Sequence, residues 1–216
     1  MKKVSIIIPV YNMKEWVESG IKCITEQTYE NLEIIIVDDG SKDNSYMKCL
    51  AEADKDRRIA VFSKNNEGPG AARNLALRKA TGDYIYFFDI DDYLEKNAIE
   101  KFVRYMENEN TDLVVCSFSM FDGEKVFRTV KKADGLKRTG GDARKDYYEH
   151  MFMYGERGIQ GAAWFKLYKT DIIRKNGIEF PKLRKSEDDV FVARYVNCID
   201  SFYMTGDVLC RYYVNS

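Results

Sequence analysis

The chain has 216 residues, 45% of them hydrophobic, which is enough for one large domain with a sizeable core. Its 34 Lys and Arg residues nearly balance 35 Asp and Glu residues, so nothing in the overall charge calls for a nucleic-acid or membrane partner. No apolar run approaches the ~20 residues of a membrane span, and the five separated cysteines favour reduced thiols. We expect a cytoplasmic protein whose electrostatic features are local.

Strand-like and helix-like segments alternate through the first half of the chain. Short apolar runs, typical of strands buried on both faces, begin at Val4, Leu32, Ile59, Tyr84 and Leu113. Apolar positions at helical spacing occupy the segments between and after them, at residues 14–26, 43–53, 70–80 and 95–108. This alternation predicts an α/β fold with a doubly wound, mostly parallel but mixed sheet and helices on both faces. Its ligands should bind at the carboxyl ends of the strands.

The pattern changes after Ser119. Residues 124–145 contain eight Lys and Arg against three Asp and Glu, and glycines interrupt any regular period. These features predict a solvated loop or hairpin, with a basic surface for an anionic lipid as the alternative. Further along, the pattern predicts one helix closed by Gly177 and another capped by Ser186.

Two aspartates end the second predicted strand. Asp38 and Asp39 are followed by Gly40 and Ser41, residues that are typical of a turn. A carboxylate at this place can accept a hydrogen bond from a nucleobase N–H, such as N3 of uracil. The alternative is a pair of acids that stabilise the turn and cap the next helix.

Three more carboxylates lie within four positions after the run that begins at Tyr84. Asp89 and Asp91 should point to one face, because the side chains of a strand alternate. Such a pair suits Mg²⁺ or Mn²⁺, which also bind the oxygens of a nucleoside diphosphate. The alternative, acids that cap the next helix, accounts for Asp92 but not for all three.

A third acidic group, Glu187, Asp188 and Asp189, begins a predicted helix. Negative charge is favoured there by the helix dipole, which is a sufficient explanation in itself. A carboxylate at the edge of a cleft can also act as a general base on a hydroxyl group. The sequence pattern leaves both explanations open.

The segment "GPGAARN" forms a glycine-rich turn that opens a helix, with Arg73 in the first turn. Backbone N–H groups and a guanidinium at this place can bind phosphate. The spacing matches neither the P-loop nor the G-x-G-x-x-G motif, so this prediction rests on few features. A structural ion pair between Arg73 and one of the acidic groups is the alternative.

Six segments, in this order and spacing, resemble glycosyltransferase family 2, whose members have the GT-A fold. They are "SIIIPVYN", "VDDGSKDNS", "GPGAARN", "FDIDDY", "KLYKTDII" and "SEDDVF", and they run from about Val4 to Phe191. The resemblance implies one GT-A catalytic domain over residues 1–216, with a nucleotide-binding half to about residue 118 and an acceptor-side half from about residue 119. Relatives often continue further, which implies that the chain is a catalytic-domain fragment.

The resemblance also implies an inverting transfer of a hexosyl or N-acetylhexosaminyl group from a UDP-sugar to a hydroxyl of a glycan or lipid-linked acceptor, in cell-surface polysaccharide synthesis. The cofactor would be Mn²⁺ or Mg²⁺, with Asp91 as its direct ligand and Asp89 beside it. Asp188 would be the catalytic base, with Asp189 as the alternative. The implied substrate-binding residues are Pro9, Tyr11, Asn12, Asp39, Arg73, Asp89, Lys166 and Glu187.

Two other functions use the same acidic motifs. A non-catalytic nucleotide-sugar or metal-binding module needs only the paired aspartates, and a nucleotidyltransferase uses the same metal motif. The late motifs around Lys166 and Asp188 favour the transferase, because a small binding module does not need them.

We expect a cytoplasmic location, with peripheral contact to the inner face of the membrane. The side chain of Trp164 is expected either to stack on an acceptor sugar or to pack in the core.

Overall fold

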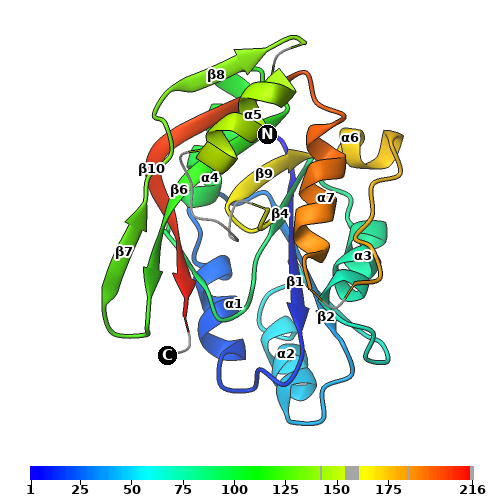
Figure 1. Ribbon diagram of the computed structural model, residues 1–216. Coiled ribbons are helices and arrows are strands. Elements are labelled where there is room, and N and C mark those ends of the chain that lie inside the picture. The colour runs from blue at the N-terminus through cyan, green and yellow to red at the C-terminus, as the bar shows by residue number, and fades with distance from the viewer. Residues whose placement is uncertain (142, 154–160, 184, 215–216) are drawn as a thin grey trace.

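The computed structural model describes residues 1–214 except 142, 154–160 and 184 (Figure 1). One sheet contains the strands β1 (Val4–Val10), β2 (Leu32–Asp38), β3 (Ile59–Ser63), β4 (Tyr84–Phe87), β5 (Tyr93–Leu94), β6 (Leu113–Phe121), β7 (Val126–Val130), β8 (Leu136–Thr139), β9 (Lys166–Lys169) and β10 (Ser201–Tyr213). The helices of the described residues are α1 (Val17–Thr25), α2 (Ser45–Ala53), α3 (Pro69–Lys79), α4 (Ala98–Asn108), α5 (Ala143–Met153), α6 (Thr170–Lys175) and α7 (Glu187–Val196). None of these helices has the length and apolar character needed to cross a membrane.

The strand β1 lies in the parallel half of the sheet, between β2 and β4. Val4 pairs with Leu32 on one side and with Tyr84 on the other, and the three strands run in the same direction. Their carboxyl ends therefore meet at one edge, where Asp39 follows β2 and Asp89 lies two residues after β4. Beyond β4 the order is β9-β6-β10-β5, and β9 runs antiparallel to both of its neighbours. The predicted mixed α/β sheet is confirmed.

Continuous apolar runs explain why the central strands are covered on both faces. In β1 the residues from Val4 to Ile8 are all buried, and Ile6 and Ile7, which point to opposite faces, have no exposed surface. In Figure 1, α5 and α7 lie in front of the sheet and α4 lies behind it. The five predicted strands and four predicted helices of the first half all occur, with helix boundaries shifted by up to three residues.

The basic segment at residues 124–145 forms two strands that join the main sheet. The strand β7 pairs with β6 and so completes the expected hairpin, whereas β8 pairs with β10. The residues of β7 from Val126 to Thr129 are exposed. The division expected near residue 118 falls inside β6, so strands from both halves of the chain share one sheet.

Two helix ends were predicted from single residues. Gly177 follows α6 with a φ of 58°, the left-handed conformation that suits a closing glycine. Ser186 occupies the position before α7, but its hydroxyl makes no capping hydrogen bond, so the predicted side-chain cap is wrong. The acidic first turn of α7 still complements the helix dipole.

Candidate functional site

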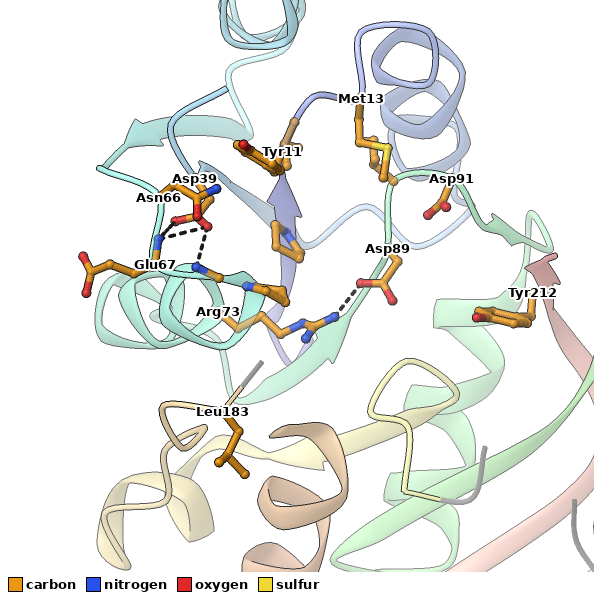
Figure 2. Close-up of a pocket in the computed structure, with 15 residues that line it drawn as sticks. Tyr11, Met13, Asp39, Asn66, Glu67, Arg73, Asp89, Asp91, Leu183 and Tyr212 are labelled. Atoms are coloured by element: carbon orange, nitrogen blue, oxygen red, sulfur yellow. Dashed lines mark hydrogen bonds and ion pairs between the residues drawn. The ribbon is translucent and has the colours of Figure 1, made fainter. Parts of the chain in front are cut away.

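A cavity of about 670 Å³ opens at the carboxyl edge of β1, β2 and β4 (Figure 2). Six of the residues predicted for the site line it: Pro9, Tyr11, Asp39, Arg73, Asp89 and Asp91. The other lining residues are Val10, Met13, Asn66, Glu67, Gly68, Pro69, Ile90, Leu183 and Tyr212. In Figure 2, Asp39 and Asn66 lie at one end, Asp91 and Tyr212 lie at the other, and the Arg73–Asp89 pair lies between them.

The adjacent aspartates after β2 have different surroundings. Asp38 stabilises the turn, because its Oδ2 accepts hydrogen bonds from the backbone N–H groups of Gly40 and Ser41. Its Oδ1 is buried without a hydrogen-bond partner in the described part of the chain. Asp38 does not line the cavity, whereas Asp39 does. Of the two, Asp39 is therefore the residue that a ligand can reach.

Asp39 closes the loop that precedes α3. Its carboxylate is 2% exposed and accepts hydrogen bonds from the backbone N–H groups of Glu67 and Gly68, the shorter of 2.7 Å to Gly68. The ammonium of Lys64 lies 3.0 Å from Oδ1. A buried carboxylate is stable when it is paired and hydrogen-bonded in this way. Asp39 therefore shapes this end of the cavity in addition to lining it.

Arg73 joins two acidic groups that lie 98 residues apart in the chain, Asp89 and Glu187. Its Nη2 lies 2.7 Å from Oδ1 of Asp89, and its Nη1 lies 2.9 Å from Oδ1 of Asp188 and 3.2 Å from Oε1 of Glu187. The residue is 5% exposed, and its guanidinium carbon lies 5.4 Å from the centre of the Phe180 ring. Burial by itself lowers the pKa of Arg73. The carboxylates of Asp89 and Asp188 raise it by a larger amount, so the pKa ends above its ordinary value and the guanidinium stays charged.

Asp89 and Asp91 line the same cavity for a reason different from the predicted one. β4 ends at Phe87, so the two aspartates lie in the turn that follows and do not alternate along a strand. The Asp91 carboxylate forms no hydrogen bond or ion pair with another described residue, and in Asp89 only Oδ1 is engaged, by Arg73. Burial, and then the charge of Asp89, raise the pKa of Asp91.

These two carboxylates fit a divalent cation. Each offers a free, hard oxygen to the cavity, and a bound cation would relieve the repulsion between them. The described residues contain no group of three or more His, Cys, Asp and Glu that could hold a metal ion by themselves. A cation bound here would need further oxygens from water or from a phosphate-bearing ligand, as is usual for Mg²⁺.

Asp92 does not cap a helix, contrary to the expectation. The residues that follow it form β5, and its Oδ1 accepts a hydrogen bond of 2.9 Å from the backbone N–H of Tyr213. Its Oδ2 is buried without a hydrogen-bond partner among the described residues. Burial, and then Asp89, hold the pKa of Asp92 well above its usual range. Asp92 thus ties the end of β10 to the loop that carries Asp89 and Asp91.

The acids at the start of α7 differ in exposure. Glu187 is buried against Arg73, Asp188 is partly exposed, and Asp189 is exposed. The Oδ2 of Asp188 also accepts a hydrogen bond of 3.2 Å from the backbone N–H of Ala163. Burial raises the pKa of Asp188 and Arg73 opposes this, with a net rise. Glu187 and Asp188 lie behind Arg73 and do not line the cavity themselves.

Besides Glu187, two residues predicted to bind substrate, Asn12 and Lys166, lie outside the cavity lining. Asn12 is exposed, and its Oδ1 accepts a hydrogen bond from the backbone N–H of Lys42, so it joins two loops. Lys166 is fully buried: its Nζ lies 2.5 Å from the carbonyl oxygen of Ala162 and 3.4 Å from the centre of the Phe165 ring. Burial, and then a nearby Lys132, lower the pKa of Lys166 well below its usual range. Both side chains contact other parts of the protein in this structure, and their roles in substrate binding stay predictions.

The sequence did not single out Tyr212, Met13 or Leu183, which line the cavity. Tyr212 comes from β10 and is brought to the site by the pairing of β10 with β6. Trp164, expected either in the core or beneath an acceptor, is 4% exposed and stacks against Tyr212, with ring centres 5.2 Å apart. The core interpretation of Trp164 is correct, and Tyr212 covers it on the cavity side.

The match to known proteins extends over most of the chain. The family model described as "Glycosyl transferase family 2" matches residues 5–176. The EpsH protein of Bacillus subtilis (strain 168) is 33% identical over 194 residues, which are 88% of this chain and 55% of EpsH. Residues 1–349 of S. aureus TarS, in complex with UDP-GlcNAc, are similar with a TM-score of 0.82 at 22% identity, over 99% of this chain and 59% of that one.

A second solved structure is the mannosyltransferase PcManGT from Pyrobaculum calidifontis in complex with GDP-Man and Mn²⁺. It is similar with a TM-score of 0.69 at 19% identity, over 97% of this chain and 56% of that one. The chain thus spans somewhat more than half the length of EpsH, of residues 1–349 of TarS and of the PcManGT chain. The structural likeness identifies the fold as GT-A. By the extent of the family match, the chain belongs to glycosyltransferase family 2.

Proposed function

We propose that the protein is a metal-dependent, inverting glycosyltransferase that uses a UDP-sugar as donor. The observation that carries this proposal is the Arg73 network, which joins Asp89 at the cavity to Asp188 beside it. A cation-binding carboxylate and a general base must be held on opposite sides of one sugar for a direct displacement. A single buried guanidinium in contact with both provides such a fixed separation.

The donor would lie along the cavity with its base near Asp39. Carboxylate oxygens accept hydrogen bonds, which suits the N3–H of uracil. The diphosphate would then lie beside Asp89 and Asp91, which would hold Mn²⁺ or Mg²⁺; when bound, the cation offsets the negative charge that develops on the leaving UDP. The complexes of TarS with UDP-GlcNAc and of PcManGT with GDP-Man and Mn²⁺ support a nucleotide-sugar donor and a divalent cation.

Asp188 would act as the general base. Its carboxylate accepts the proton of the acceptor hydroxyl while that oxygen attacks the anomeric carbon, and the bond from this carbon to the phosphate oxygen breaks on the opposite side. The oxygen of the leaving UDP keeps the bonding electrons, and because attack and departure take place on opposite faces, the anomeric configuration inverts. The raised pKa of Asp188 makes it a stronger base than an ordinary aspartate, and Arg73 with the Ala163 N–H orients its two oxygens.

The acceptor we propose is a hydroxyl of a glycan or of a lipid-linked glycan in cell-surface polysaccharide synthesis. The strand β7 supports this class, because its residues from Val126 to Thr129 are exposed between two exposed lysines, Lys125 and Lys131. A surface that is both apolar and basic suits an anionic lipid carrier at the inner face of a membrane.

Calorimetry with UDP, with and without Mn²⁺, tests the donor half of this proposal. We expect Mn²⁺-dependent UDP binding that Asp91→Asn weakens by roughly tenfold or more, and release of UDP from UDP-hexoses in a turnover assay. The control is Asp54→Asn, which changes an exposed aspartate beyond α2. UDP binding that is indifferent to Mn²⁺ and to Asp91→Asn would contradict the site. Binding without turnover favours a sensor module, and pyrophosphate release from a nucleoside triphosphate favours a nucleotidyltransferase.

A further inference from the structure

Tyr212 lies at the opposite end of the cavity from Asp39. In Figure 2 it lies beyond Asp89 as seen from Arg73, whereas Asp39 and Asn66 lie at the opposite end. One face of its ring is covered by Trp164, since the two rings are nearly parallel, at 6°, with centres 5.2 Å apart. Tyr212 is only partly buried and lines the cavity, so its other face is the one available to a ligand.

The ring is held rigidly in this position. Trp164 is 4% exposed and itself packs against Phe118 and Phe165 in the core. The backbone on the other side of Tyr212 is fixed by the hydrogen bond from the Tyr213 N–H to Asp92, next to the loop with Asp89 and Asp91. A rigid aromatic ring loses little conformational entropy when a ligand packs against it, so its contact area contributes fully to binding.

The chemistry of the cavity determines which part of a donor reaches this ring. A nucleotide-sugar is linear, in the order base, ribose, diphosphate and hexose. If the base lies at Asp39 and the diphosphate at Asp89 and Asp91, the hexose is the part that remains for the Tyr212 end. A pyranose has an apolar face of C–H groups, and the face of an aromatic ring packs against such a surface, whereas a ring face donates no hydrogen bond to a phosphate.

We propose that the free face of Tyr212 packs on the hexose of the UDP-sugar donor, so that Tyr212 is a determinant of donor-sugar binding. The inference rests on the proposed function, because it takes the position of the diphosphate from the Asp89 and Asp91 site. It adds a residue from the last strand of the sheet to a donor site otherwise built on the loops after β1, β2 and β4.

The test compares two dissociation constants for the same variant, those for UDP and for a UDP-hexose, in the presence of Mn²⁺. UDP-glucose and UDP-GlcNAc are the probes. For the UDP-hexose that the wild type binds, we expect Tyr212→Ala to raise the Kd by about 5- to 20-fold. The Kd of UDP should stay unchanged within about twofold. Tyr212→Phe keeps the ring and should preserve both constants within about twofold.

The control is Tyr105→Ala, which removes a tyrosine that is also stacked, against Tyr203 with ring centres 5.2 Å apart, but does not line the cavity. It should leave both constants unchanged. An equal rise in both constants for Tyr212→Ala, or no rise in either, would overturn the inference while the UDP site stands. Failure of the wild type to bind UDP with Mn²⁺ would overturn the proposed function itself.

Discussion

The Nη1 atom of Arg73 lies 2.9 Å from Oδ1 of Asp188, and this contact joins α3 to α7 across the carboxyl edge of the sheet. The same guanidinium also contacts Asp89 and Glu187, so one buried cation faces three carboxylates. The network is therefore short of positive charge. A divalent cation at Asp89 and Asp91 would supply what is missing and would couple metal binding to the position of the base.

Replacement of Arg73 by Met should be strongly destabilising. Arg73 is 5% exposed, so the change leaves the buried Glu187 and the partly exposed Asp188 without their cationic partner. We expect a loss of about 3 to 5 kcal/mol in the free energy of unfolding, measured by urea denaturation at pH 7. Arg73→Lys keeps the charge but not the planar fork, and should lose less stability while still losing most of the turnover.

Arg78 is a matched control for this measurement, because it lies on the same helix and also faces a glutamate. Its ion pair with Glu179 is 3.5 Å long, and both side chains are 58% exposed. Arg78→Met should change the free energy of unfolding by no more than about 0.5 kcal/mol. A similar loss of stability for Arg73→Met and Arg78→Met would mean that the buried Arg73 network stabilises the fold no more than an exposed ion pair does.

Asp188→Asn should abolish transfer and keep nucleotide binding. The amide cannot accept a proton at neutral pH, so we expect kcat to fall by about 10²- to 10⁴-fold with the Kd of UDP changed by less than about threefold. Asp189 is exposed and makes no contact with Arg73, so Asp189→Asn should retain near-normal turnover. Steady-state kinetics on both variants decide between the neighbouring acids, and the opposite ranking would move the base to Asp189.

Gly20→Ala should destabilise the protein although it replaces a glycine inside a helix. Alanine at such a position normally stabilises a helix by up to about 1 kcal/mol. A Cβ at Gly20 would clash with the backbone oxygen of Ile90, the residue between Asp89 and Asp91. We expect a loss of about 1 to 3 kcal/mol on urea denaturation and weaker Mn²⁺-dependent UDP binding. Ser19→Ala, at an exposed neighbouring position of α1, should leave both quantities unchanged.

Glu33 should make stability depend on pH in the acid range. Burial raises its pKa, but hydrogen bonds from Ser5, Thr81 and Gly82 and the ammonium of Lys3 lower it more, to about 2. Because the folded-state pKa lies below the ordinary value of 4.5, the carboxylate stabilises the fold above pH 4.5. This contribution is lost as the pH falls from 4.5 towards 2.

Comparison of the wild type with Glu33→Gln isolates this effect. The difference in the free energy of unfolding should be about 3 kcal/mol at pH 7 and fall to about 1 kcal/mol at pH 3, by urea denaturation at each pH. Glu15→Gln, in which the native side chain is 77% exposed, should show no such dependence. A difference that stays constant with pH would assign the loss to packing and not to the ionised carboxylate.

The parts of the fold that could be predicted are those that depend on a pattern within one short segment of the sequence. The strands of the parallel half are buried on both faces, so each appears as a continuous apolar run such as Val4 to Ile8. The position of Asp89 and Asp91 could be predicted from the motif, but not the turn that holds them, because an apolar run does not reveal where its strand ends. The ion pair of Arg73 was one of two alternatives, since spacing alone does not say which helix faces which loop.

The remaining parts depend on contacts between distant segments. Tyr212 reaches the cavity through the pairing of β10 with β6, which no local pattern reveals. Lys166 was expected to face a ligand, yet it is fully buried, with its Nζ at the carbonyl oxygen of Ala162 and over the Phe165 ring, and local sequence does not reveal such surroundings. Asn12, whose φ of 54° is left-handed, likewise accepts a hydrogen bond from the neighbouring loop at Lys42, a contact between segments 30 residues apart.

The place of β10 in the sheet has a consequence for biosynthesis. Among the described strands β10 is the last to leave the ribosome, yet it lies between β6 and β5. A nascent chain therefore holds β6 with one side open, an edge that can pair with other chains, until β10 inserts. The same insertion brings Tyr212 to the cavity. An incompletely folded molecule would thus carry the nucleotide end of its site before it carries the end that faces the sugar.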